Sequence, residues 1–154
     1  MATNGARPRL PPLDLDVGTV DKTGNKRFMP RLFDHVDLRV LRLAEVAAFY
    51  ELLLPALGFT QRKEQIEGWL EFEAPGYEAT AFFGITESAA HVVNENRIAF
   101  WAETAADVDR VAGVAKCAGA RNMEGPMDHA PGYYAVFFED PSGNRLEVCH
   151  RVRR

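Results

Sequence analysis

The chain has 154 residues and a net charge of −4, with 47% hydrophobic and 26% charged residues. This composition is typical of one globular domain, or of two small modules sharing a core, and it excludes wholesale disorder. The negative charge argues against a protein whose main task is to neutralise nucleic-acid phosphates. No apolar run approaches the roughly 20 residues of a membrane span, and no secretory signal is apparent, so we expect a cytoplasmic protein.

Residues 1–32 are rich in Pro, Gly, Asn, Lys and Arg and keep no apolar period. We therefore expect an N-terminal arm, a domain at 33–150 and a basic tail at 151–154. The cysteines, Cys117 and Cys149, are too few for a disulfide framework, and neither has a neighbouring cysteine to suggest a zinc clip. Both are predicted to be reduced.

The first half of the domain predicts one strand, one helix and three strands. Polar and apolar residues alternate from His35 to Val40, which is typical of a half-buried strand. A helical apolar stripe begins at Val46, with Pro55 bending or ending the helix and Gly58 stopping it. Further strands are expected at 59–65, 68–73 and 78–85. These elements form a βαβββ module at 33–85.

The second half, 96–150, repeats this order. A strand at 97–103 precedes a helix that a capping box at Thr104 opens and Gly119 closes. Strands are then expected near 121–124, at 133–139 and at 145–150. The intervening segment 125–132, framed by glycine and proline, is predicted to be a loop, either a lid over a pocket or a plain connection.

A shift of 62 residues superposes the two halves, taking His35 to Arg97 and Val46 to Val108. A period this long with two copies indicates a duplicated module rather than a solenoid. We therefore predict an α+β fold in which two βαβββ modules form a cupped, barrel-like mixed sheet. Exposed sheet edges favour pairing of two chains as a homodimer.

Five segments carry a family resemblance. They are FDHVDLRV at 33–40, AFY at 48–50, LGF at 57–59, RIAF at 97–100 and YAVFFEDPSGNRLEV at 134–148. Together they resemble the glyoxalase, bleomycin-resistance and extradiol-dioxygenase proteins, the vicinal oxygen chelate (VOC) superfamily. The resemblance covers about residues 33–150 and implies the paired βαβββ fold and a homodimer. It does not single out one activity, because this fold hosts isomerases, lyases, dioxygenases and drug-sequestering proteins.

The resemblance also implies a divalent metal, held by a His on the first strand, a His or Gln opening the second module and a Glu on the last strand. His35 and Glu147 match the first and last positions, whereas Arg97 stands at the second and Phe82 or Phe83 at a fourth that some members use. The first hypothesis is therefore a lyase, isomerase or dioxygenase dependent on Zn, Ni, Mn or Fe. Its metal ligands are His35 and Glu147, with His129 as the candidate third, and Glu147 and Arg97 are its catalytic residues.

The second hypothesis is a metal-free binding or sequestering protein for a small organic ligand. An always-charged guanidinium repels a cation, and Arg97 could instead pair with Glu147 or receive a carboxylate, phosphate or enolate oxygen. The side chains expected to line the cup are Arg39, Arg97, Trp101 and Tyr134, with Trp69 and Tyr133 as further aromatic candidates that could equally be packing residues. Glu71 and Glu73 are predicted to lie on a solvated strand face.

Overall fold

The computed structural model describes residues 18–20, 26–28, 33–64, 66–75 and 81–152. It divides into two compact units, Met1–Leu32 and Phe33–Arg154. In the first unit, strands β1 (Gly18–Val20) and β2 (Lys26–Phe28) pair as an antiparallel hairpin. All the residues expected to carry chemistry belong to the second unit.

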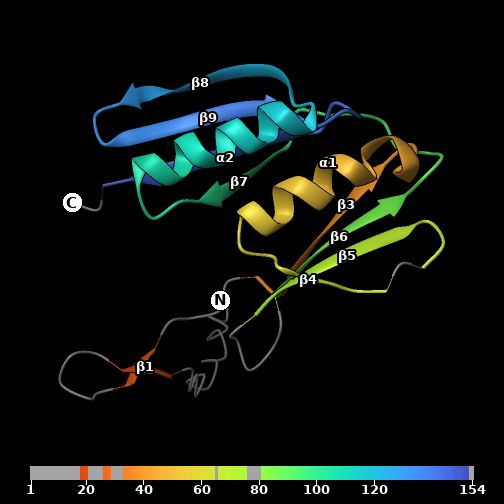
Figure 1. Cartoon of the computed structure of the whole chain (residues 1–154), viewed down its shortest axis with the longest axis horizontal. Coiled ribbons are helices and arrows are strands. Elements are labelled where there is room, and N and C mark those ends of the chain that lie inside the picture. Colours follow the sequence, from red (N-terminus) through yellow and green to blue (C-terminus); the bar gives the residue numbers. More distant parts are fainter. Residues whose placement is uncertain (1–17, 21–25, 29–32, 65, 76–80, 153–154) are drawn as a thin grey trace, which may run out of the picture. The chain divides into compact units, whose positions relative to one another are not determined.

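The first module is a four-stranded mixed sheet with one helix (Figure 1). Strand β3 (His35–Val40) leads into helix α1 (Leu43–Ala56), followed by β4 (Gln61–Arg62), β5 (Trp69–Ala74) and β6 (Ala81–Glu87). The sheet order is β3-β6-β5-β4, and only β3 and β6 run parallel. Pro55 lies in the last turn of the helix, which ends one residue later. A proline is tolerated there because little of the hydrogen-bond ladder is lost.

The second module repeats this plan. Strand β7 (Arg97–Trp101) precedes helix α2 (Ala105–Ala118), followed by β8 (Arg121–Ala130), β9 (Tyr133–Glu139) and β10 (Arg145–Arg151), in the sheet order β7-β10-β9-β8. The Thr104 side chain accepts from the Asp107 backbone N–H, and Gly119 caps the other end with φ +101°. Shifted by 62 residues, the bounds of α1 coincide with those of α2. The predicted βαβββ duplication is confirmed.

Both sheets bury the face that their helix covers, and they share one core. The Phe83 ring of β6 lies 5.7 Å from the Phe100 ring of β7, and Phe49 of α1 lies 6.4 Å from Phe138 of β9. Figure 1 shows the two helices next to one another, each lying along its own sheet. The sheets are cupped but do not close into a barrel, and the two helix-free faces lie outside the shared core.

Polar groups also join the modules inside this core. The Tyr50 hydroxyl of α1 donates to Asp140 in the β9–β10 turn at 2.6 Å, and the Asn144 side-chain amide donates to the Arg39 carbonyl at 3.2 Å. Asp140 in turn accepts from the Asn144 backbone N–H and side-chain amide, both at 2.9 Å. The turn therefore joins the first module to the second through hydrogen bonds.

The prediction of a loop at 125–132 is wrong. Strand β8 continues through this segment to Ala130, paired along β9 with three irregularities of register. These bulges remove the two-residue alternation by which strands are recognised in a sequence. Pro126 is tolerated because β8 is an edge strand, where a missing N–H breaks no inner ladder.

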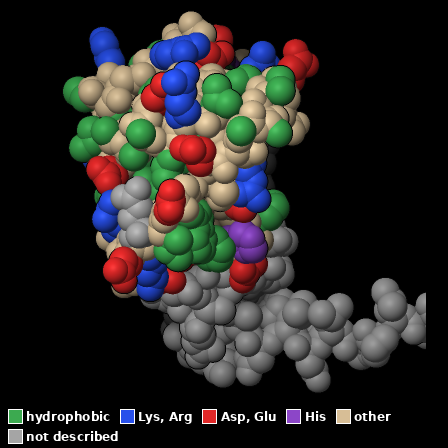
Figure 2. All heavy atoms as spheres, turned by 90° about the vertical axis from the view of Figure 1, so that its right-hand side faces the viewer, with side chains coloured by type: hydrophobic (Ala, Val, Ile, Leu, Met, Phe, Trp, Pro, Cys, Tyr) green, Lys and Arg blue, Asp and Glu red, His purple; other side chains and the backbone are tan. Residues whose placement is uncertain are grey.

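The basic tail expected from Arg151 also needs correction, because β10 includes Arg151. Residues 153 and 154 lie outside the described part of the chain. Acidic and basic side chains are interspersed over the coloured surface in Figure 2, with no continuous basic area on that side. Within the described ranges, neither helix has the length and apolar character needed to span a membrane.

Candidate functional site

The helix-free face of the second module brings Arg97 and Glu147 together. Arg97 opens β7, and Glu147 lies on β10 opposite Ala99, one alternation step away on the same face. The Arg97 Nη1 atom lies 4.0 Å from Glu147 Oε2, and its guanidinium lies 4.4 Å from the centre of the Phe137 ring. The Glu147 side chain is 8% exposed and that of Arg97 is 42% exposed, so a buried carboxylate sits beside an accessible cation.

Glu147 is held by two further neighbours. The Tyr133 hydroxyl donates a short hydrogen bond to Glu147 Oε1. Burial and this hydrogen bond raise the pKa of Tyr133 to about 12. Burial, followed by a hydrogen bond to Glu147, raises the pKa of the Cys149 thiol. Both groups therefore stay protonated near neutral pH, and the Tyr133 hydroxyl donates to the carboxylate.

Arg151 completes the same face, because its guanidinium lies 3.7 Å from the centre of the Tyr133 ring. Phe137, Cys149 and Arg151 were not among the site residues expected from the sequence. The available indication was strand alternation, which places residues 145, 147, 149 and 151 on one side of β10. The register then sets Phe137 opposite Glu147.

His129 reaches this face from the bulged strand β8. Its ring contacts Phe137 edge-on, with centroids 4.5 Å apart, and lies 5.9 Å from the Tyr133 ring. Its Nδ1 atom is 3.9 Å from a Glu124 carboxylate oxygen. The Nε2 atom is buried and has no hydrogen-bond partner among the described residues. His129 thus packs beside Phe137 and Tyr133, and Tyr133 is the residue that donates to Glu147.

His35 lies on the other sheet. Its Nδ1 atom is 3.0 Å from Asp34 Oδ2, and its ring stacks on Phe82 with a centroid separation of 4.4 Å. This is the helix-free face of the first module, on the opposite side of the shared core from Glu147. One chain therefore does not bring the two predicted metal ligands together.

The donor set of one chain does not fit a divalent metal. Within the described ranges, no group of three or more His, Cys, Asp and Glu side chains is placed to hold an ion. Glu147 already accepts from Tyr133 and has the Arg97 cation beside it. A guanidinium at this position opposes a second positive charge.

The other predicted lining residues are spread over the fold. Arg39 pairs with Asp37 at 2.9 Å on the helix-free face of the first module. Tyr134 lies on the helix-covered face, where its hydroxyl donates to Asp109 of α2 at 2.8 Å, away from Arg97 and Glu147.

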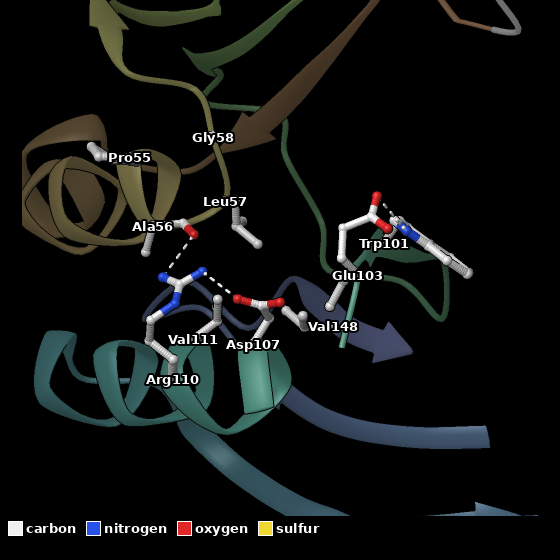
Figure 3. A pocket seen from close by; sticks show the side chains of 11 residues that line it. Pro55, Ala56, Leu57, Gly58, Trp101, Glu103, Asp107, Arg110, Val111 and Val148 are labelled. Atoms are coloured by element: carbon white, nitrogen blue, oxygen red, sulfur yellow. Dashed lines mark hydrogen bonds and ion pairs between the residues drawn. The ribbon is translucent and has the colours of Figure 1, made fainter. Parts of the chain in front are cut away.

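Trp101 stands at the end of β7, 46% exposed, with its indole N–H 3.3 Å from Glu103 Oε1. Both residues border a pocket of about 370 Å³ between the end of α1 and the start of α2 (Figure 3). There Arg110 donates to the Ala56 carbonyl at 3.2 Å and to Asp107 at 3.3 Å. Arg110 thus provides a hydrogen-bond donor for a backbone carbonyl at the C-terminal end of α1. This pocket therefore lies where the two modules contact each other.

Residues 32–148 match the family model of the glyoxalase/bleomycin resistance protein/dioxygenase superfamily. The chain belongs to this superfamily. The resemblance in the sequence motifs is thereby confirmed. No curated protein matches the chain.

Solved structures of the superfamily share the fold. A glyoxalase/bleomycin resistance protein from Albidiferax ferrireducens T118 is 25% identical with a TM-score of 0.66, over 79% of this chain and 99% of that one. A family enzyme from Burkholderia phytofirmans PsJN is 18% identical with a TM-score of 0.60, over 77% and 98% of the two chains. The fosfomycin resistance protein FosX from Listeria monocytogenes, complexed with Mn(II) and sulfate, is 19% identical with a TM-score of 0.58, over 80% and 93%.

Proposed function

We propose that this superfamily member binds a small organic anion on the helix-free face of its second module, with Arg97 as the receiving cation. The observation that carries this proposal is the position of Arg97, accessible and fixed over Phe137. At 4.0 Å from Glu147 the guanidinium is beyond hydrogen-bond distance, so its N–H groups remain available to a ligand. A guanidinium receives a carboxylate or phosphonate through two parallel hydrogen bonds.

Glu147 and Arg97 are the catalytic pair in this proposal. Arg97 stabilises negative charge on a ligand oxygen, and Glu147 accepts a proton from the bound ligand. Tyr133 positions the Glu147 carboxylate through its hydrogen bond. The Arg97–Glu147 pair can stabilise the negative charge that develops in a proton-transfer or addition reaction. It suits many small anionic substrates.

The binding test uses phenylphosphonate and benzoate in isothermal titration calorimetry. Arg97→Ala should weaken binding by tenfold or more, and Arg97→Lys should restore only part of it, because an ammonium cannot form the forked contact. The matched control is Arg121→Ala, which removes an arginine that pairs with Glu139 on the same sheet. Equal binding by native protein and Arg97→Ala would overturn the proposal.

The two helix-free faces also favour a homodimer. The first-module face carries the carboxylates of Asp37, Glu71 and Glu73, of which the first and last pair with Arg39 and Lys63, so it keeps a net negative charge. The second-module face carries Arg97, Arg145 and Arg151 against Glu139 and Glu147, so it keeps a net positive charge. We propose that the first-module face of one chain lies against the second-module face of its partner, because the charges are complementary. Light scattering should show a dimer that Arg145→Glu weakens and that added Glu71→Arg restores. A monomeric native protein would contradict this arrangement.

A metal-dependent lyase, isomerase or dioxygenase is the second candidate. The retained His35 and Glu147 and the unpartnered Nε2 atom of His129 favour it. These side chains could meet only if two chains pair, because one chain keeps His35 and Glu147 on different sheets. Elemental analysis separates the candidates: near-stoichiometric Zn, Ni, Mn or Fe, lost in both His35→Ala and Glu147→Ala, would favour the metal enzyme. No uptake after supplementation would favour the Arg97 site.

A further inference from the structure

The pocket at the contact between the two modules combines apolar and charged lining residues (Figure 3). Its volume is about 370 Å³, and its apolar part includes Leu57 at the end of α1 and Val111 of α2. The charged groups are Glu103, which follows β7, and Asp107 and Arg110 in the first two turns of α2. The pocket lies at the helix ends, whereas the proposed anion site and dimer contact use the helix-free faces.

Arg110, the basic residue of this lining, already has two acceptors. Its guanidinium donates to the Ala56 carbonyl at 3.2 Å and to Asp107 Oδ1 at 3.3 Å. The second oxygen of Asp107 accepts from the Thr104 hydroxyl at 2.7 Å. The Arg110–Asp107 pair therefore balances one positive charge with one negative charge, and Glu103 is the excess charge of the pocket.

The Glu103 carboxylate has one oxygen atom available for a ligand. Its Oε1 atom accepts from the Trp101 indole N–H at 3.3 Å. Its Oε2 atom has no hydrogen-bond or ion-pair partner within the described ranges. Two carboxylates thus face one guanidinium in this lining, and the guanidinium is already paired. The charge balance favours a positively charged ligand beside Glu103 Oε2.

We propose that this pocket binds a small primary alkylammonium, with the ammonium group at Glu103 Oε2 and the alkyl chain against Leu57. An ammonium group has three N–H donors, and its hydrogen bonds to a carboxylate are stronger than those between neutral groups. The alkyl chain displaces water from the apolar part of the lining. The site uses none of the residues around Arg97 and does not depend on the proposed anion-binding function.

The test follows the Trp101 indole N–H by nuclear magnetic resonance of the ¹⁵N-labelled native protein, because this group donates to Glu103. The chain has two tryptophans, and Trp101→Phe assigns the signal. The probe is n-butylammonium, compared with neutral n-butanol and anionic butyrate at equal ionic strength. We expect a saturable shift with half-saturation below about 20 mM for the ammonium and none for the other two compounds. Absence of a saturable shift with the ammonium, or an equal shift with n-butanol or butyrate, would overturn the proposal.

Three variants locate the ammonium group. Glu103→Gln keeps an oxygen acceptor for the Trp101 indole N–H and removes the charge, so it should weaken binding by about fivefold or more. The matched control Glu95→Gln changes an exposed carboxylate outside the pocket and should leave binding unchanged.

Arg110→Met removes the cation of the pocket and should strengthen ammonium binding by about twofold to fivefold, whereas a pocket that receives anions through Arg110 would show the opposite preference. Circular dichroism verifies that the variant keeps its fold. Unchanged affinity in Glu103→Gln, or weaker ammonium binding by folded Arg110→Met, contradicts the proposal.

Discussion

The Tyr50 hydroxyl donates to the Asp140 carboxylate across the boundary between the two modules, at 2.6 Å and with both residues fully buried. Tyr50 lies on α1 and Asp140 in the turn between β9 and β10. Burial, followed by the negative charge of Asp140, raises the pKa of Tyr50 well above its usual value. The hydroxyl therefore stays a donor, and the pair fixes how the modules meet.

Tyr50→Phe should destabilise the protein by about 1–3 kcal/mol, because the buried Asp140 loses one donor while it keeps those from Asn144. Urea unfolding followed by circular dichroism measures the change. The control, Tyr134→Phe, removes a hydroxyl bonded to the exposed Asp109 and should cost less than about 1 kcal/mol. Equal effects of the two substitutions would contradict the buried network.

Tyr133 should titrate late in the folded protein, at a pKa of about 12. Between the unfolded value of 10.0 and about 12, the folded state holds a proton that the unfolded state has lost. The stabilisation from the Tyr133–Glu147 hydrogen bond is thus fully present below pH 10 and is lost as the pH rises through about 12. Unfolding experiments across this range should show a fall in stability that is smaller in Tyr133→Phe than in native protein.

Gly125→Ala should destabilise the protein by about 2 kcal/mol or more. Gly125 has φ +88°, and a Cβ atom there would lie 2.6 Å from the Ala135 carbonyl oxygen. The matched control is Gly113→Ala in the interior of α2, where a Cβ atom meets nothing within 4 Å. That substitution should stabilise by about 0.5–1 kcal/mol, since alanine favours helix. Thermal unfolding of both variants checks the opposite signs.

Thr104→Ala should destabilise α2 by about 0.5–2 kcal/mol, because Thr104 Oγ1 accepts from the Asp107 N–H at 3.1 Å. Thr104→Ser keeps the acceptor and should recover most of the loss. Hydrogen exchange of the first turn of α2 would locate the effect. Unchanged protection in Thr104→Ala would count against this cap.

The order of elements in the two βαβββ modules could be predicted from the sequence because their causes are local. The apolar stripe of α1, the cap at Thr104 and the alternation in β3 each depend on neighbouring residues. The full length of strand β8 was not predicted, because its pairing is set by β9 and its bulges remove the alternation. The path of β8 therefore depends on contacts with a segment distant in the sequence.

The same division holds for the candidate sites. Alternation placed Glu147 and Cys149 on one strand face, and the family motifs drew attention to His35, Arg97 and Glu147. The cytoplasmic location stays a prediction. Which residues touch could not follow from alternation, because contact depends on the register between strands.

The sequence by itself determined the duplicated βαβββ plan, since periodicity, caps and turn residues act within a few positions of the chain. Only the tertiary structure decided that the helix-covered faces share one core, which leaves His35 and Glu147 on the two helix-free faces. It also set the Arg97 guanidinium over Phe137 and the Trp69 indole over Gly84. Such pairings arise from packing between distant segments, whose relative positions the local pattern of residues does not encode.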